Sequence, residues 1–362
     1  MTHGSATAGG SDGSGAGFDF DGASVLVTGG TGSLGRAIVR RLLEHTAARR
    51  VIVFSRDEHK QWAMQQELAE AGHDARARYF LGDVRDLKRL RLALAGVDAV
   101  VHAAAMKHVA AAEFNPFEAV RTNILGSQNL IEAAIDADVR RVLAVSTDKA
   151  SNPVSLYGAT KLVGDRMFLH GNAYVGNGPG AFAVIRFGNL SGSRGSILPK
   201  FRRLAAEGRE LPVTDPEASR FWVDVDAAAA QVLAGVADMA GGELFVPKAP
   251  SVTVAALVAA VAPGAATKVV GLRPGEKKHE ELIGTHDSTY TVDQGDRYVI
   301  TSSLAGEASV AGQPVGDGFA YTSDRNDRWL TEAEVAAMVG KSLDGDGGVT
   351  SGGESGATSG GA

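Results

Sequence analysis

From residue 23 onward, short apolar runs alternate with longer segments in which apolar residues recur every three or four positions. The short runs predict buried strands, and the longer segments predict amphipathic helices, whose period is 3.6 residues. Strands are expected at Val25–Thr28, Val51–Phe54, Arg78–Leu81, Ala99–His102, Val142–Ser146 and Phe182–Phe187. Helices are expected between them, at Leu34–Glu44, Glu58–Ala71, Leu87–Ala95, Phe117–Ala137 and Leu156–Leu169.

This alternation predicts an α/β fold, a doubly wound parallel Rossmann sheet with a smaller C-terminal lobe. Short strands separated by longer helices indicate βαβ units, and right-handed crossovers place the ligand crevice at the carboxyl ends of the strands. We assign residues 18–190 to the Rossmann domain. After residue 190 prolines cluster, so we assign 191–342 to a substrate-binding lobe with segments that can return to the Rossmann core. Further helices are expected at Val252–Val261 and Thr331–Val339.

The ends of the chain and its overall composition narrow the class of protein. Residues 1–17 and 343–362 are rich in Gly and Ser, which predicts disordered tails. The net charge of −6 argues against a nucleic-acid-binding protein, and the absence of cysteine excludes disulfides and thiolate chemistry. The sequence contains neither a signal peptide nor a long apolar run typical of a membrane span. We therefore expect a cytoplasmic protein that binds no membrane.

A glycine-rich turn, Gly29-Gly-Thr-Gly-Ser-Leu-Gly35, follows the first strand and opens the first helix. Such a turn lets the backbone approach a pyrophosphate, and a helix N-terminus favours the negative charge. The spacing Gly29-x-x-Gly32-x-x-Gly35 matches the variant found in short-chain dehydrogenases. The turn therefore predicts a dinucleotide site. The residues expected in it are Gly29, Thr31, Gly32, Ser33, Leu34 and Gly35.

The end of the second strand discriminates between the two nicotinamide cofactors. NAD enzymes usually place an acid there for the ribose 2′-hydroxyl, whereas this strand ends Phe-Ser55-Arg56, with Lys60 one helical turn later. These donors suit a 2′-phosphate, which favours NADP. Asp57 is interpreted as a helix N-cap. Asp83 and Val84 are expected beside the adenine, and Ala103 is small enough to let the cofactor pass.

Two pairs of residues predict the chemistry. Tyr157 and Lys161 lie four positions apart, on one helix face, and a nearby cation would lower the tyrosine pKa so that the phenolate takes a proton from a substrate hydroxyl. Just upstream the fifth strand ends in Asp148-Lys149. This pair could be an ordinary surface pair at a strand end. It could also supply the acid and base of a dehydration, with Lys149 deprotonated by neighbouring positive charges.

At this point a family resemblance becomes specific. The strings SerThrAspLysAla (146–150) and TyrGlyAlaThrLys (157–161) resemble those of the inverting UDP-N-acetylglucosamine 4,6-dehydratases of the pseudaminic-acid pathway, within the extended short-chain dehydrogenases. The resemblance runs from about residue 23 to 339. Further matching strings are SerArgAspGlu-x-Lys (55–60), AlaAlaMetLysHisVal (104–109), ArgPheGlyAsn (186–189), GlySerArgGlySer (192–196), ThrAsp (214–215), ArgPheTrp (220–222), PheValProLys (245–248) and ArgProGlyGluLys (273–277).

The resemblance implies a lyase that uses NADP transiently to convert UDP-N-acetylglucosamine into a 4-keto-6-deoxy sugar inverted at C5. Tyr157 would act in oxidation at C4, Lys149 at C5 and Asp148 as the acid at C6. It also implies a homo-oligomer built on dimers, with a hexamer as one form. Thr147 would join the catalytic residues, and Lys107 and Leu190 the cofactor site. The substrate contacts it implies are Lys107, Thr147, Asn189, Leu198, Thr214, Arg220, Arg273 and Glu276.

Two other interpretations remain open at this stage. A nucleotide-sugar 4-epimerase or reductase would use the same Tyr157 and Lys161 but would leave Asp148 and Lys149 without a task. A non-catalytic NADP-binding protein would not need the intact tyrosine–lysine pair. No metal site is expected, because the histidines at 102, 108, 279 and 286 lack ligand spacing.

Overall fold

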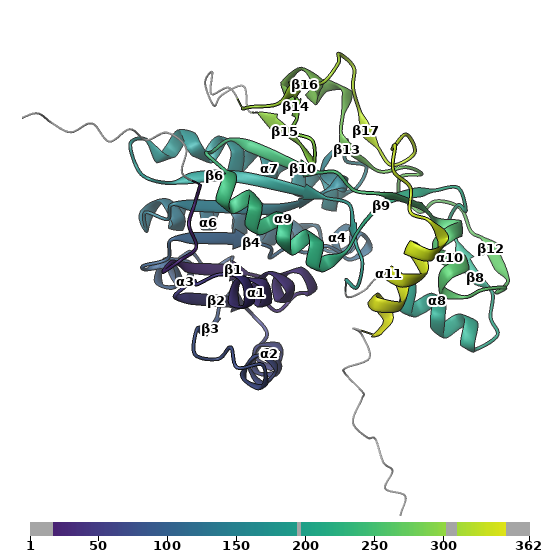
Figure 1. Cartoon of the computed structure of the whole chain (residues 1–362), viewed down its shortest axis with the longest axis horizontal. Coiled ribbons are helices and arrows are strands. Elements are labelled where there is room, and N and C mark those ends of the chain that lie inside the picture. Colours follow the sequence, from purple (N-terminus) through teal and green to yellow (C-terminus); the bar gives the residue numbers. More distant parts are fainter. Residues whose placement is uncertain (1–16, 194–196, 302–309, 345–362) are drawn as a thin grey trace, which may run out of the picture.

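The computed structural model describes residues 17–193, 197–301 and 310–344, and at its centre lies one large sheet (Figure 1). Within the described residues this sheet has ten strands in the order β16-β14-β15-β10-β6-β5-β4-β1-β2-β3. The strands are β1 (Ser24–Thr28), β2 (Arg50–Ser55), β3 (Ala77–Leu81), β4 (Ala99–His102), β5 (Arg141–Thr147), β6 (Ala181–Phe187), β10 (Glu243–Pro247), β14 (Thr291–Asp293), β15 (Arg297–Thr301) and β16 (Gln313–Pro314).

The strands from β3 to β10 pair in parallel, and β15, β14 and β16 continue the sheet in antiparallel pairing. The chain order reverses between β1 and β4, so a crevice opens at the carboxyl ends of these two strands. The predicted doubly wound Rossmann fold is therefore confirmed. Each predicted strand is found within one residue of its expected bounds.

Helices cover both faces of the sheet and enclose two hydrophobic cores. On one face α1, α2 and α9 pack against the strands, as Figure 1 shows for α1 and α9, and on the other face α3, α6 and α7 do so. These helices are α1 (Ser33–His45), α2 (Glu58–Glu70), α3 (Leu87–Leu94), α6 (Gly126–Asp136), α7 (Leu156–Val175) and α9 (Val225–Asp238).

The predicted helix at 117–137 is not continuous. It consists of α5 (Pro116–Val120), a π-helical turn η1 (Arg121–Leu125) and α6, and a short α4 (Val109–Phe114) precedes it. A π turn inserts an extra residue into the helical repeat, and such turns are frequent at functional sites. Here the turn contains Asn123, which is buried and whose side-chain amide accepts from Met106 N at 2.8 Å and donates to Met106 O at 3.0 Å.

A smaller lobe lies beside the carboxyl edge of the sheet, at the right of Figure 1. Its two hydrophobic clusters join helices α8, α10 and α11 to short strands. The lobe contains α8 (Ile197–Ala206), β8 (Leu211–Val213), β9 (Ser219–Val223), β11 (Ser251–Thr253), α10 (Val254–Val261), β12 (Thr267–Val269) and α11 (Glu332–Asp344). Strand β7 (Asn189–Leu190) pairs with β9 and connects this lobe to the Rossmann sheet.

The proposed division of the chain at residue 190 separates the lobes only in part. Helix α9 and strands β10, β14 and β15 come after this residue and yet belong to the Rossmann core, because their apolar side chains complete its two hydrophobic clusters. Strand β16 extends the same sheet at its edge. The predicted tails at 1–17 and 343–362 fall almost entirely outside the described residues, as does most of the GlySerArgGlySer string (192–196).

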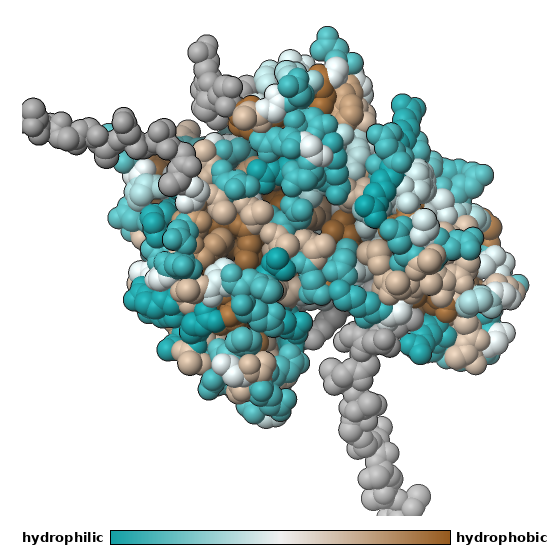
Figure 2. Space-filling model, viewed as in Figure 1, coloured by the Kyte–Doolittle hydropathy of each residue, from teal (hydrophilic) through white to brown (hydrophobic). Residues whose placement is uncertain are grey.

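On the face drawn in Figure 2, hydrophilic residues cover much of the surface, and hydrophobic residues are interspersed among them. Across 17–193, 197–301 and 310–344, no helix is both long enough and apolar enough to span a membrane.

Candidate active site

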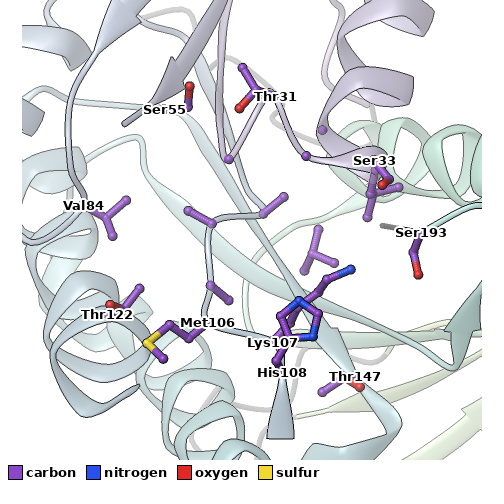
Figure 3. Close-up of a pocket in the computed structure, with 18 of the residues that line it drawn as sticks. Thr31, Ser33, Ser55, Val84, Met106, Lys107, His108, Thr122, Thr147 and Ser193 are labelled. Carbon is purple, nitrogen blue, oxygen red and sulfur yellow. The ribbon is translucent and has the colours of Figure 1, made fainter. Parts of the chain in front are cut away.

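A cavity of about 970 Å³ occupies the crevice at the carboxyl ends of β1, β4 and β5. Figure 3 shows Thr31 and Ser55 in one part of it, and Lys107, His108 and Thr147 in another. These side chains lie at the carboxyl ends of different strands of the parallel sheet or in the loops that follow them. The fold thus assembles in one place residues that are more than a hundred positions apart in the sequence.

The glycine-rich turn forms the part of the cavity next to helix α1. Gly29 has a φ of +65°, and a Cβ added there would lie 2.8 Å from the backbone N of Ala104, so the turn requires glycine. Helix α1 begins after Gly32 with no side-chain cap and no acidic residue in its first turn. Its first amide groups and the positive end of its dipole therefore suit an anion such as a pyrophosphate.

The end of β2 carries the residues expected at the cofactor's ribose. Arg56 is 59% exposed, and its Nη1 lies 3.6 Å from Oδ2 of Asp83. Asp57 caps α2 by accepting from the Lys60 amide, as the sequence suggested, and also pairs with Lys60 Nζ at 2.6 Å. Both cations are paired with a carboxylate and remain accessible, so each has a charge to offer a 2′-phosphate.

Tyr157 and Lys161 occupy the first turns of α7, whose N-cap Ser155 accepts from the Gly158 amide. Lys161 Nζ donates to the carbonyl O of Val145 at 2.8 Å. Burial raises the pKa of Tyr157 to about 12, while Lys149 lowers it and Asp148 raises it. The expectation that Lys161 brings the pKa of Tyr157 below its ordinary value is not met in this structure, because Lys149 is the lysine that lowers this pKa and burial outweighs its charge.

Asp148 and Lys149 begin a short 3₁₀ turn, η2 (Asp148–Ala150), directly after β5. Lys149 Nζ donates to Oδ1 of Asp148 at 2.9 Å, and the hydroxyl of Thr147 donates to the same oxygen at 2.9 Å. Although burial lowers the pKa of Lys149, Asp148 and Glu280 raise it, and the net result lies well above the ordinary value. The expectation of a Lys149 deprotonated by positive neighbours is wrong, since its closest charged neighbours are carboxylates.

Glu280 is a member of this cluster that sequence reasoning missed. Its Oε1 lies 3.2 Å from Lys149 Nζ and 3.7 Å from Arg220 Nε, and its side chain is only 4% exposed. The only available signal was that Glu280 lies three residues after the motif at 273–277. A carboxylate that is distant in sequence gives no spacing pattern, so only the fold brings it to Lys149.

Most of the sequence-predicted residues line this cavity. These are Gly29, Thr31, Gly32, Ser33, Leu34, Gly35, Ser55, Arg56, Lys60, Asp83, Val84, Ala103, Lys107, Thr147, Lys149, Tyr157, Lys161, Asn189 and Leu190. The structure does not place Thr214, Arg220, Arg273 and Glu276 in its lining. Arg273 pairs with Glu276 through Nη2 and Oε1 at 2.6 Å, and Arg220 Nη1 donates to the carbonyls of Ser219 and Lys278 at 2.7 and 2.9 Å.

Two predicted site residues have no side-chain surface in the cavity. Leu198 is fully buried in the hydrophobic cluster of the smaller lobe with Trp222 and Leu257, so its side chain does not face the cavity. Asp148 also has no exposed surface. A proton passing from Asp148 to a molecule in the cavity must therefore travel through the hydroxyl of Thr147 or the amine of Lys149, which both line it.

The Rossmann sheet, the glycine-rich turn at its switch point and the Tyr157–Lys161 pair define an extended short-chain dehydrogenase/reductase. Comparison with known proteins agrees with this class. The chain belongs to the polysaccharide biosynthesis protein family, whose model matches residues 25–302.

The chain is similar in sequence to enzymes with two different activities. The chain is 44% identical over 331 residues to the inverting UDP-N-acetylglucosamine 4,6-dehydratase of Campylobacter jejuni, covering 88% of this chain and 98% of that protein. It is 36% identical over 284 residues to the UDP-glucose 4-epimerase of Rickettsia canadensis, covering 76% and 82%.

Solved structures agree with the sequence comparison. The structure of Pen from Bacillus thuringiensis superposes with a TM-score of 0.82 at 33% identity, covering 90% of this chain and 98% of that one. The dTDP-glucose 4,6-dehydratase DesIV from Streptomyces venezuelae, solved with NAD and TYD bound, gives a TM-score of 0.62 at 28% identity, covering 70% and 86%.

Proposed function

We propose that this chain is an NADP-dependent UDP-N-acetylglucosamine 4,6-dehydratase that inverts C5. The observation that carries the proposal is the place of Lys149, which lines the same cavity as Tyr157 and Lys161 and is hydrogen-bonded to Asp148. Oxidation of a sugar hydroxyl needs only the tyrosine and a lysine. An amine backed by carboxylates beside them supplies what elimination of water requires, a base and a proton source. The similarity to the Campylobacter jejuni enzyme supports this choice over the epimerase.

The residues of the cavity act at three positions of the sugar, C4, C5 and C6. Bound NADP would supply a hydride acceptor for C4 and a hydride donor for C6. Tyr157, as the phenolate, takes the proton of the C4 hydroxyl, and Lys149 removes the proton at C5. The proton on Lys149 passes through Asp148 and Thr147 to the C6 hydroxyl, which leaves as water. A proton exchanged with solvent returns to C5 from the opposite face and inverts that centre, and Tyr157 releases its proton to solvent.

The choice of NADP rests on the side chains at the end of β2. Arg56 and Lys60 are accessible cations within the cavity lining, and Ser55 adds a hydroxyl beside them. Asp57 is already engaged as the cap of α2, so this strand end offers no carboxylate dedicated to a ribose 2′-hydroxyl. The donor set therefore fits a 2′-phosphate.

The substrate lies, in this proposal, where Lys107, Thr147 and Asn189 line the cavity near Lys149. Lys107 suits a pyrophosphate oxygen, and Thr214, Arg220, Arg273 and Glu276 are proposed to contact the nucleotide from the smaller lobe. Arg273 is 67% exposed, so its guanidinium can exchange Glu276 for a phosphate.

We further propose a homo-oligomer based on dimers. Phe114 on α4 and Phe117 on α5 are 87% and 76% exposed, and Leu125 on the following π turn is 45% exposed. Large apolar side chains that gather on adjacent helices are typical of an interface between subunits. Location in the cytoplasm stays a prediction.

Incubation of the purified protein with UDP-N-acetylglucosamine tests the function. The product followed by NMR should be a 4-keto-6-deoxy sugar with inverted C5, formed without added reductant. Stoichiometric consumption of NADPH would favour a reductase, and a product that retains its C6 hydroxyl with inversion at C4 would favour an epimerase. No turnover with tight NADP binding would favour a non-catalytic protein.

A further inference from the structure

Lys149 is held between two carboxylates that come from different parts of the fold. Asp148 lies next to it on η2, and Glu280 reaches it from the segment before β13 (Glu281–Ile283). The distances from Lys149 Nζ are 2.9 Å to Asp148 Oδ1 and 3.2 Å to Glu280 Oε1. Sugar chemistry at C5 needs one base, so a second buried carboxylate at the same amine calls for a separate explanation.

Independent contacts fix Glu280 in this place. Its neighbour Glu281 accepts hydrogen bonds through Oε1 from Ser151 Oγ and Asn152 Nδ2, both at 2.6 Å, and Lys277 Nζ donates to Ser151 O at 2.5 Å. The segment 277–281 is therefore fastened to the loop that carries Lys149. The placement of Glu280 does not depend on its own ion pair.

Glu280 and Asp148 differ in the number of hydrogen bonds that their carboxylates accept. Oδ1 of Asp148 accepts from both Lys149 and Thr147, whereas Arg220 Nε lies 3.7 Å from Oε1 of Glu280, beyond hydrogen-bond distance. Oε2 of Glu280 and Oδ2 of Asp148 are both buried and accept no hydrogen bond from the described residues, so the two carboxylates differ at their other oxygen. The carboxylate of Glu280 can therefore accept a proton.

The charged side chains around Glu280 belong to η2, to β9 and to its own segment. Lys149 and Asp148 face it from η2, Arg220 from β9, and Lys277 from its own segment. Burial and Asp148 raise the pKa of Glu280, and Lys149 and Arg220 lower it, with a net rise. A carboxylate with raised proton affinity beside an ammonium favours sharing of the proton between them.

We infer that Glu280 is a positioning residue that accepts the proton of the Lys149 ammonium and so delivers Lys149 as the neutral amine that attacks C5–H. One N–H bond of Lys149 breaks and an O–H bond forms on Oε1 of Glu280, so the net charge of the cluster is unchanged. Once Lys149 has passed the C5 proton through Asp148 and Thr147 to the departing C6 hydroxyl, the reverse transfer from Glu280 restores the ammonium. This inference rests on the proposed dehydratase function.

Replacement of Glu280 by Gln tests the inference, because glutamine keeps the shape and an acceptor oxygen but takes no proton. With UDP-N-acetylglucosamine, kcat should fall about ten- to a hundredfold, the size of one charge-assisted contact, with KM nearly unchanged. Wild-type kcat should decline as the pH falls and Glu280 becomes protonated, and this acid limb should be absent from the variant. Glu280→Asp should restore the limb and part of the rate.

Glu217→Gln is the matched control, since Glu217 is 82% exposed and pairs with Lys278 of the same segment. It should keep the wild-type rate and pH profile. Thermal unfolding of both glutamine variants should begin within a few degrees of wild type.

If wild type dehydrates the substrate and Glu280→Gln does so with an unchanged pH profile, the inference is wrong and the function stands. Equal losses in Glu280→Asp and Glu280→Gln, with the acid limb kept in both, would show a purely structural role. Failure of wild type to dehydrate the substrate refutes the proposed function itself.

Discussion

Lys149 Nζ lies 2.9 Å from Oδ1 of Asp148 at the end of β5, where Lys149 faces the cavity and Asp148 lies in the protein interior. The Lys149 side chain is 29% exposed and lines the cavity, whereas the Asp148 carboxylate has no exposed surface. The buried carboxylate of Asp148 stabilises the ammonium form of Lys149. Because Lys149 faces the cavity, the proton of its amine is the one that exchanges with a bound molecule. The Asp-Lys pair is therefore not a solvated surface pair.

Replacement of Lys149 by Ala should abolish most of the dehydration and leave NADP binding intact. The cavity residues expected to hold NADP, such as Arg56 and Lys161, do not depend on the Lys149 side chain. Turnover should fall by about a hundred- to ten-thousandfold, as for a lost acid–base group. Rates measured with UDP-N-acetylglucosamine and NADP titrations check both parts. In D₂O the wild type should place deuterium at C5 of the product.

Lys200→Ala, which removes an exposed lysine of α8, is the control and should behave as wild type. Near-normal turnover of Lys149→Ala with C5 still inverted would show that another base performs the step.

Arg56→Ala should weaken NADP about ten- to a hundredfold, the value of one charge-assisted contact, and NAD much less. The reason is that only NADP carries the 2′-phosphate that Arg56 is proposed to bind. Fluorescence titration of both cofactors measures the ratio of the two affinities. Arg325→Ala, at an arginine that is 84% exposed, should leave the ratio unchanged. Equal weakening of both cofactors would remove Arg56 from the 2′-phosphate site.

Alkaline pH should destabilise the protein partly through Tyr157. Because burial raises its folded-state pKa from 10.0 to about 12, its contribution to stability is complete below pH 10 and is lost as the pH rises through 12. Tyr157 contributes at most about 2–3 kcal/mol to the free energy of unfolding in this way. Urea unfolding of wild type and Tyr157→Phe between pH 9 and 12 should show a shallower decline for the variant. Parallel declines would contradict the buried, neutral phenol.

Gly158→Ala should disturb both stability and turnover. A Cβ on Gly158 would collide with the backbone carbonyl of Lys149, so α7 and η2 would have to separate. Overpacking of this kind typically costs about 1–3 kcal/mol, measured as the free energy of unfolding in urea. Gly340→Ala is the matched helical control, because nothing lies within 4 Å of its added Cβ. It should be neutral or stabilise by up to about 1 kcal/mol. The same loss in both variants would mean that the α7–η2 contact is not the cause.

The sequence alone was sufficient for the central architecture. The apolar runs from Val25 to Phe187 are buried strands, and their alternation with helices implies a parallel sheet whose strand ends form a crevice. Local motifs were equally informative for the glycine-rich turn and for the pair Tyr157–Lys161. In each case the residues of the motif lie close together in the sequence, so spacing carries the information.

Only the tertiary structure decided how the charges act. Tyr157 and Lys149 have their proton affinities set by burial and by carboxylates, and neither effect follows from local spacing. Glu280 meets Lys149 across 131 positions because segment 277–281 packs on the loop after β5. The burial of Leu198 likewise does not follow from the sequence, since the face of a helix that becomes buried depends on the partners it packs against. Secondary structure arises from local patterns, whereas protonation states arise from three-dimensional neighbours.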